Sequence, residues 1–213
     1  MVNMTRRVNI LGNGPNAGLF KRGTSGKLLV CNMPPFEITR QEVHATVMVD
    51  FKMMKSLMEG HLQLDMYDWI LGTRPKIWME NQGTFYLRYS HLIRDFYTHI
   101  PKYVVGLAQG HQQQAATNFN CGHMAVHYAC NRMKAKEVHL YGFDSLFDMN
   151  LDSFTDLLLE SDRGTQNTVR LAGIWRPIWE HMFREFPDTK FVLHHTHNNC
   201  KIDLSENCSV EVK

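Results

Sequence analysis

The sequence has no apolar run long enough to cross a bilayer, no CxxC motif and no large excess of charge of either sign. A membrane-spanning helix needs about 20 mostly apolar residues, so no transmembrane segment is expected. The net charge of +2 comes from basic and acidic residues scattered along the chain. Without a basic stripe, a nucleic-acid-binding surface is not expected either.

Cysteine is scarce, and the five cysteines show no disulfide pattern. Their odd number and irregular spacing favour free thiols in a reducing compartment. The residues from Met1 to Arg7 also lack the apolar core of a signal peptide. The sequence therefore predicts a cytoplasmic protein.

Apolar runs of strand length alternate with stretches of helical character along the 213 residues. Most of these runs are continuous, which is typical of parallel strands covered on both faces. The predicted strands are residues 8–11, 27–31, 45–49, 76–80, 103–107, 137–141 and 190–194. The predicted helices are residues 51–60, 89–99, 122–134 and 167–186, the last with a kink or break at Pro177.

This alternation predicts an α/β fold, namely a Rossmann-like, doubly wound, mostly parallel sheet with helices on both faces. The length suits a single domain over residues 1–213. No repeat, low-complexity tract or linker divides it. The acidic, turn-rich segment 147–165 is a candidate lid.

Residues 8–15, with the sequence VNILGNGP, join an apolar run to a glycine-flanked turn. Gly12 and Gly14 have no Cβ atom, so the backbone can approach a ligand closely. Asn13 offers a hydrogen-bond donor and an acceptor, and Pro15 suits the first turn of a helix whose free N–H groups would face an anion. The pattern predicts a nucleotide or phosphate site; an ordinary strand-to-loop turn is the alternative.

Polar residues follow the other predicted strands as well, and the carboxyl ends of parallel strands share one edge of the sheet. The residues at these ends are Asn13, Asn32, Asp50, Gly142, Asp144 and the histidine-rich run 194–199. Asn32 and Asp50 suit ribose hydroxyl groups or base edges, or they cap the chain that leaves each strand. Cys121 and Gly122 open a predicted helix, where backbone N–H groups suit a phosphate, unless the helix simply starts there. A catalytic thiol at Cys121 has no supporting histidine pattern.

Twelve histidines raise the question of a metal site. His123 and His127 are four residues apart on one helix face, but the glutamate of an HExxH motif is missing. His195 and His197 share one face of the last predicted strand, without an obvious carboxylate as third ligand. We therefore predict no metal site and consider His197, His195 and Asp144 as candidate catalytic acids and bases.

The order of several motifs resembles the sialyltransferase-like proteins, in particular the bacterial sialyltransferases of glycosyltransferase family 42. These motifs are GNGP at 12–15, CN at 31–32, a strand ending before Asp50, Cys-Gly at 121–122 and EVHLYGFDS at 137–145. The resemblance covers residues 7 to about 199. It implies a pocket for a CMP-sugar, lined by Gly12, Asn13, Gly14, Pro15, Asn32, Asp50, Cys121, Gly122 and Gly142. More distantly, the pattern resembles the 6-hydroxymethylpterin diphosphokinase-like proteins.

The chain departs from the family 42 pattern at four places. Asn16 replaces a serine, Asp50 stands where the family has Asn-Pro-Ser, and Leu146 replaces the first of two tyrosines. The segment 161–167 lacks the family's catalytic histidine.

These patterns predict a glycosyltransferase that moves a sugar from a nucleotide donor, with CMP-sugar favoured, to a glycan or other hydroxyl acceptor with inversion and without a required cofactor. The first alternative is a magnesium-dependent diphosphokinase with Asp50 and Asp144 as metal ligands. The second is a nucleotide-binding protein without catalytic activity.

Overall fold

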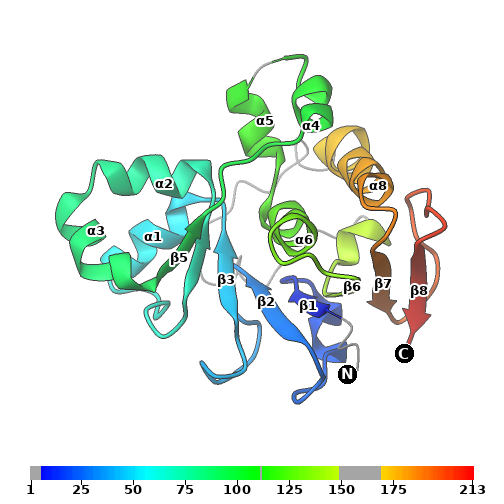
Figure 1. Cartoon of the computed structure of the whole chain (residues 1–213), viewed down its shortest axis with the longest axis horizontal. Coiled ribbons are helices and arrows are strands. Elements are labelled where there is room, and N and C mark those ends of the chain that lie inside the picture. The colour runs from blue at the N-terminus through cyan, green and yellow to red at the C-terminus, as the bar shows by residue number, and fades with distance from the viewer. Residues whose placement is uncertain (1–5, 111, 149–168) are drawn as a thin grey trace.

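The computed structural model describes residues 6–110, 112–148 and 169–213 of the chain. They form one sheet of eight parallel strands with helices on both faces, as Figure 1 shows. The strands are β1 (Arg7–Leu11), β2 (Lys27–Cys31), β3 (Ala45–Met48), β4 (Trp69–Leu71), β5 (Ile93–Phe96), β6 (Glu137–Tyr141), β7 (Lys190–His195) and β8 (Cys208–Val212). This is the α/β, Rossmann-like architecture that the sequence predicts.

The strand order β5-β4-β3-β2-β1-β6-β7-β8 places β1 in the middle of the sheet. From β1 the chain moves outward to β5, returns to β6 on the other side of β1, and then moves outward to β8. The direction of winding therefore reverses between β1 and β6. In open parallel sheets, ligands bind beside the carboxyl ends of the strands at such a reversal.

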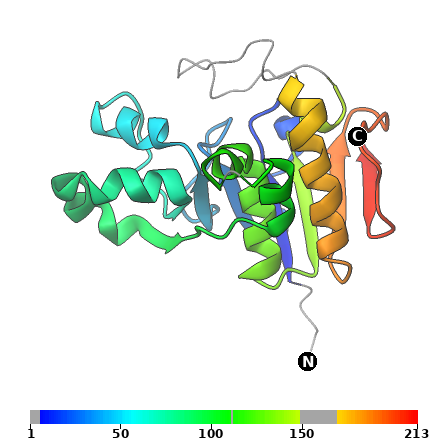
Figure 2. The same cartoon turned by 90° about the horizontal axis from the view of Figure 1, so that it is seen from above.

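Both faces of the central strands are buried. On one face, α6 (Cys121–Asn131) and α8 (Arg176–Glu185) cover a core that includes Ile10, Leu29 and Val47 (Figures 1 and 2). On the other face, the 3-10 helix η1 (Pro15–Leu19) contacts β6 and β7, and α1 (Phe51–Met58) packs on Met48. Successive residues of a strand thus pack into the cores on opposite faces of the sheet. The sequences of these strands are therefore apolar at successive positions.

Two of the predicted strands are helices in the structure. Residues 76–80 belong to α2 (Thr73–Glu80), and residues 103–107 belong to α4 (Lys102–Leu107). The Lys76 and Glu80 side chains form an ion pair at the i,i+4 spacing of a helix. The apolar residues of both segments have strand composition, but in residues 76–80 the two charged residues follow the helical period.

The predicted helix over residues 89–99 is also wrong. This stretch contains the end of α3 (Gly83–Tyr89), the 3-10 helix η2 (Ser90–Leu92) and β5. Strands β4, β5 and β8 are absent from the prediction. β4 has three residues, and β5 and β8 lie at the two edges of the sheet, where a strand needs fewer apolar residues.

The long C-terminal helix does not break at Pro177, because the backbone is helical from residue 169 through Glu185. A π-helical turn, η5 (Leu171–Trp175), leads directly into α8, so the irregularity expected near Pro177 takes the form of this turn just before it. The short helix α5 (Gln112–Asn118) lies in the predicted loop before α6.

Apart from Phe147 and Asp148, the candidate lid 147–165 lies outside the described residues. None of the described helices combines the length and apolarity that a membrane crossing requires.

Candidate functional site

The loops after β1 and β6 are bonded directly to each other at the reversal of the winding. The Gly12 N–H donates to the Tyr141 carbonyl oxygen over 2.7 Å, and the Gly14 N–H donates to the Gly142 carbonyl oxygen over 3.0 Å. A Cβ atom on Gly14 would lie 2.8 Å from the Gly142 oxygen, and one on Gly12 would meet the same oxygen still closer. The two glycines therefore permit contact between the loops, whereas the sequence suggested close approach of a ligand.

Pro15 begins η1, as expected, but the anion at this helix start belongs to the protein. The Asn16 backbone N–H donates to Asp144 Oδ2 over 3.2 Å, and the Asn16 side-chain amide also donates to Asp144. His195 Nε2 lies 3.5 Å from the same carboxylate. Asp144 is buried, and its oxygens are occupied by these contacts. Asp144 thus joins the loops after β1 and β6 to the end of β7.

Asn13, Asn32 and Cys121 come together from β1, β2 and α6, as the sequence predicts for a nucleotide edge. The Cys121 thiol donates to Asn32 Oδ1 over 2.9 Å, Asn32 Nδ2 lies 3.5 Å from Asn13 Oδ1, and Asn13 donates to the Met33 carbonyl oxygen over 2.9 Å. Asn32 adopts a φ of 61°, a left-handed conformation that asparagine tolerates. Both asparagine side chains are half-buried and so reach solvent. Burial raises the pKa of the Cys121 thiol to about 12, so this cysteine is a neutral thiol at neutral pH.

Asp50 and Gly122 have local structural roles. Asp50 caps α1 by accepting a hydrogen bond from the Lys52 N–H over 3.1 Å, and Arg74 lies 3.8 Å from it. A Cβ atom on Gly122 would lie 2.7 Å from the Phe143 ring, so this glycine lets the start of α6 pack on the loop after β6. For Asp50 the structure shows the capping alternative.

His123 and His127 are held by separate partners and do not chelate jointly. His123 Nδ1 accepts from the Asn120 N–H over 3.3 Å, and His123 Nε2 donates to the Trp175 carbonyl oxygen over 3.1 Å. His127 Nδ1 lies 2.5 Å from the Tyr97 hydroxyl. Burial lowers the pKa of His123 to about 3, so this histidine is a neutral link between α6 and η5.

We expect His123 to make folding stability depend on pH. Because its folded pKa lies below 6.5, the unfolded chain binds the proton first, and stability falls as pH decreases below 6.5. The slope is up to about 1.4 kcal/mol per pH unit, or roughly 2 kcal/mol between pH 6.5 and 5. Urea unfolding of the wild type and His123→Gln at pH 7, 6 and 5 measures it. The variant should be less stable at pH 7 but show a flatter slope; parallel slopes would contradict this assignment.

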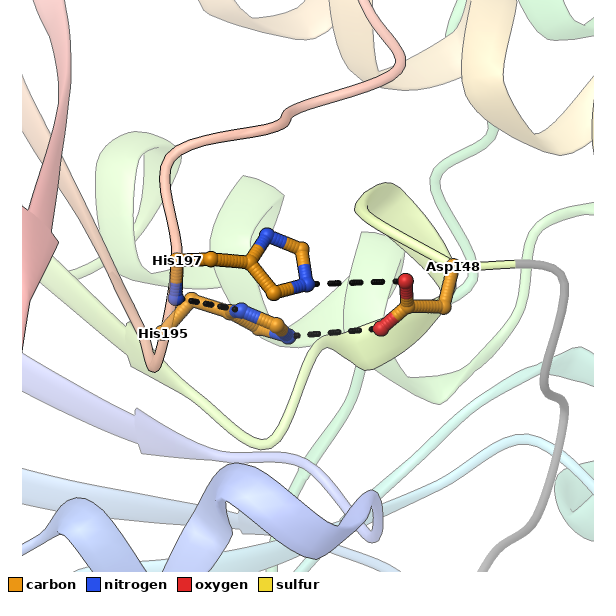
Figure 3. Close-up of side chains that lie close together, drawn as sticks. All are labelled: Asp148, His195 and His197. Atoms are coloured by element: carbon orange, nitrogen blue, oxygen red, sulfur yellow. Dashed lines mark hydrogen bonds and ion pairs between the residues drawn. The ribbon is translucent and has the colours of Figure 1, made fainter.

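Figure 3 shows a cluster that joins two predicted catalytic histidines to an additional carboxylate, Asp148. His197 Nε2 lies 3.5 Å from Asp148 Oδ1, and His195 Nε2 lies 3.8 Å from Asp148 Oδ2. His195 is the last residue of β7 and His197 follows it, whereas Asp148 follows the 3-10 helix η3 (Asp144–Leu146) after β6. The predicted His197, His195 and Asp144 therefore do converge.

Access to solvent separates these four residues into two pairs. The side chains of Asp144 and His195 are 8% and 2% exposed, whereas those of Asp148 and His197 are 47% and 41% exposed. The second pair is therefore the one that is accessible to molecules in solution. The Arg176 side chain fixes the backbone here by donating to the Ser145 and Asp148 carbonyl oxygens, each over 3.0 Å.

The histidine rings are held in defined orientations by the backbone. The His197 N–H donates to His195 Nδ1, and the Asn199 N–H donates to His197 Nδ1, each over 3.2 Å. Since His197 Nδ1 accepts, the proton of its neutral ring lies on Nε2 and points towards Asp148. Burial, followed by the neighbouring His197, lowers the pKa of His195 and keeps that ring neutral.

The sequence contains one signal for Asp148 that motif reasoning did not use. Asp148 follows Asp144 by four residues, and the Asp148 N–H donates to the Asp144 carbonyl oxygen over 2.9 Å, so one turn of chain separates the two carboxylates.

Comparison of the chain with protein-family models, curated proteins and solved structures yields no match in any of the three.

Proposed function

We propose that the protein transfers a glycosyl group from a nucleotide-activated sugar, with a CMP-sugar favoured, to a hydroxyl group with inversion. The observation that carries the proposal is the convergence at the reversal between β1 and β6. There, half-buried amides lie on one side and the accessible pair Asp148 and His197 on the other. A binding site for a nucleotide-sugar needs two such ends, one for the nucleotide and one for the reacting carbon of the sugar.

The nucleotide end consists of Asn13, Asn32 and the start of α6. Amide groups can donate to phosphate oxygens and accept from ribose hydroxyl groups. Cys121 contacts Asn32 and begins the 11-residue helix α6, whose N-terminus favours negative charge. These groups suit stabilisation of the departing nucleotide phosphate without a metal ion.

At the reacting end, Asp148 is in this proposal the base that accepts the proton of the acceptor hydroxyl. Its carboxylate is accessible, and His197 Nε2 faces it at 3.5 Å, within reach of an electrostatic contact. Asp144 and His195 are positioning residues in this proposal, because both are buried behind the accessible pair. The sequence-based hypothesis placed the base on His197, His195 or Asp144.

The diphosphokinase alternative requires Asp50 and Asp144 to bind magnesium together. Asp50 caps α1, and Asp144 is surrounded by donors from Asn16. No observation on the described residues favours that alternative over glycosyl transfer. An activity assay distinguishes a nucleotide-binding protein without catalytic activity from both the glycosyltransferase and the diphosphokinase.

A thermal-shift panel tests the proposed donor class. The panel contains cytidine, uridine, guanosine and adenosine mono- and diphosphates, each with and without magnesium. A ligand at about 100 times its Kd adds about 2.7 kcal/mol to stability, so binding is easily seen. Stabilisation by a cytidine nucleotide without magnesium supports the proposal, and hydrolysis of a CMP-sugar then tests catalysis. Binding without hydrolysis or transfer favours the non-catalytic alternative.

Asn13→Ala should weaken nucleotide binding about tenfold, since it removes amide contacts worth about 1–1.5 kcal/mol. The loss of its bond to Met33 should cost little stability, because no core volume is removed. Isothermal titration with the nucleotide selected by the panel measures the affinity. Asn198→Ala, at an exposed position beyond β7, is the matched control. Equal affinities for wild type and Asn13→Ala would contradict the assigned nucleotide edge.

A further inference from the structure

Asp148, His195 and His197 present three ligand-type atoms to a common point. Their carboxylate oxygen and ring nitrogens all lie within 4.8 Å of one another. The separations of 3.5 Å from Asp148 Oδ1 to His197 Nε2 and of 3.8 Å from Asp148 Oδ2 to His195 Nε2 are longer than typical hydrogen bonds. They are close to the roughly 3.4 Å between neighbouring ligands of a tetrahedral zinc ion with bonds of about 2.0–2.1 Å.

The types of ligand atom select the class of metal. Two imidazoles with one carboxylate suit zinc and other first-row divalent transition metals, whereas magnesium and calcium prefer oxygen ligands. Asp148 and His197 are about half exposed, so an ion can enter and keep a position open to solvent. The two carboxylates, Asp144 and Asp148, supply negative charge beside neutral rings.

The surroundings restrict both rings before any ion arrives. Phe147 stacks on His195 with ring centroids 4.0 Å apart and meets His197 edge-on at 5.8 Å. Behind His195, Nε2 lies 3.0 Å from the Asn16 amide and 3.5 Å from Asp144. The two ring contacts hold the imidazoles in place, whereas the Asn16 amide and Asp144 lie beside the Nε2 atom that would bind the ion, so this amide must turn away when the ion binds.

We propose that Asp148, His195 and His197 bind one divalent transition-metal ion of the zinc class. The ion bonds to a carboxylate oxygen and to the Nε2 atom of each ring. In both rings the proton moves from Nε2 to Nδ1, so each ring stays neutral, and the hydrogen bonds that His195 Nδ1 and His197 Nδ1 accept from the His197 and Asn199 N–H groups are lost. This proposal goes beyond the glycosyl transfer and does not depend on it. An ion on Asp148 would compete with its role as base and so inhibit transfer.

Titration of the untagged, chelator-treated chain with Zn²⁺, followed by calorimetry, tests the site. The expected result is one equivalent bound, with affinity about 100-fold lower in His197→Gln and in Asp148→Asn. His91→Gln, at an exposed histidine of η2, is the matched control and should bind like the wild type. Circular dichroism of each metal-free variant confirms that it is folded.

Nitrogen-15 NMR of the histidine rings gives a second measurement that does not depend on affinity. We expect the ring proton of His197 to lie on Nε2 without metal and on Nδ1 with one equivalent of Zn²⁺. Unchanged zinc affinity in both ligand variants would overturn the proposal. So would binding that is no tighter than in a chain lacking both histidines, or a preference for Mg²⁺.

Discussion

Gly12→Ala is expected to destabilise the protein by about 3 kcal/mol, the upper end of the usual cost of overpacking. The new Cβ atom would meet the Gly142 carbonyl oxygen, which is backbone and cannot rotate away, and would lie 3.0 Å from the Gly142 carbonyl carbon. Gly142 itself has a φ of 75°, and a Cβ atom added there would lie 2.8 Å from the Ala17 Cβ atom, so this loop has no room to retreat. The two loops must therefore separate, which breaks the Gly12 and Gly14 hydrogen bonds to β6 and its loop.

A shift of about 10 °C in Tm corresponds to that loss for a chain of this length. Gly18→Ala is the matched control, because an added Cβ at Gly18 meets nothing within 4 Å and should change stability by less than about 0.5 kcal/mol. Differential scanning calorimetry measures both variants. Equal Tm values for the two would show that the loop contact does not require glycine at position 12.

The central strands could be predicted because their environment is uniform. β1, β2, β3, β6 and β7 are buried on both faces, so their sequences are apolar at successive positions. β5 and β8 have fewer buried residues, and their sequences IRDF and CSVEV carry charged residues. Their strand conformation depends on pairing with β4 and β7, which local sequence does not encode.

The candidate site was predictable only where a residue lies next to the end of a central strand. Asn13, Asn32, Asp144 and His195 met this condition, and the structure brings them to one edge. Asp148 lies four residues beyond Asp144, and its contact with His197 arises from the folding of η3 towards β7. Likewise, Asn16 appeared only as a departure from a family motif, but its amide groups hold the Asp144 carboxylate.

Asp148→Asn is expected to reduce the rate of glycosyl transfer by 10²- to 10⁴-fold, about the contribution of a positioned general base. The amide has nearly the same shape as the carboxylate but cannot accept the acceptor proton. Nucleotide affinity should stay within about twofold of the wild type, since Asn13 and Asn32 are unchanged and neither has a hydrogen bond to Asp148 among the described residues. Steady-state kinetics with the donor selected by the thermal-shift panel should therefore show a lower kcat with little change in donor KM.

Asp188→Asn provides the matched control, because Asp188 is exposed and precedes β7 at its amino end, opposite the site. It carries the same chemical change and should keep full activity. His197→Gln separates the two roles at the site. It removes the imidazole that faces Asp148 at 3.5 Å but keeps the carboxylate, so the loss of transfer rate should be smaller than in Asp148→Asn. If Asp148→Asn stays active while His197→Gln is inactive, the base is the imidazole, and the proton assignment of the accessible pair must be reversed.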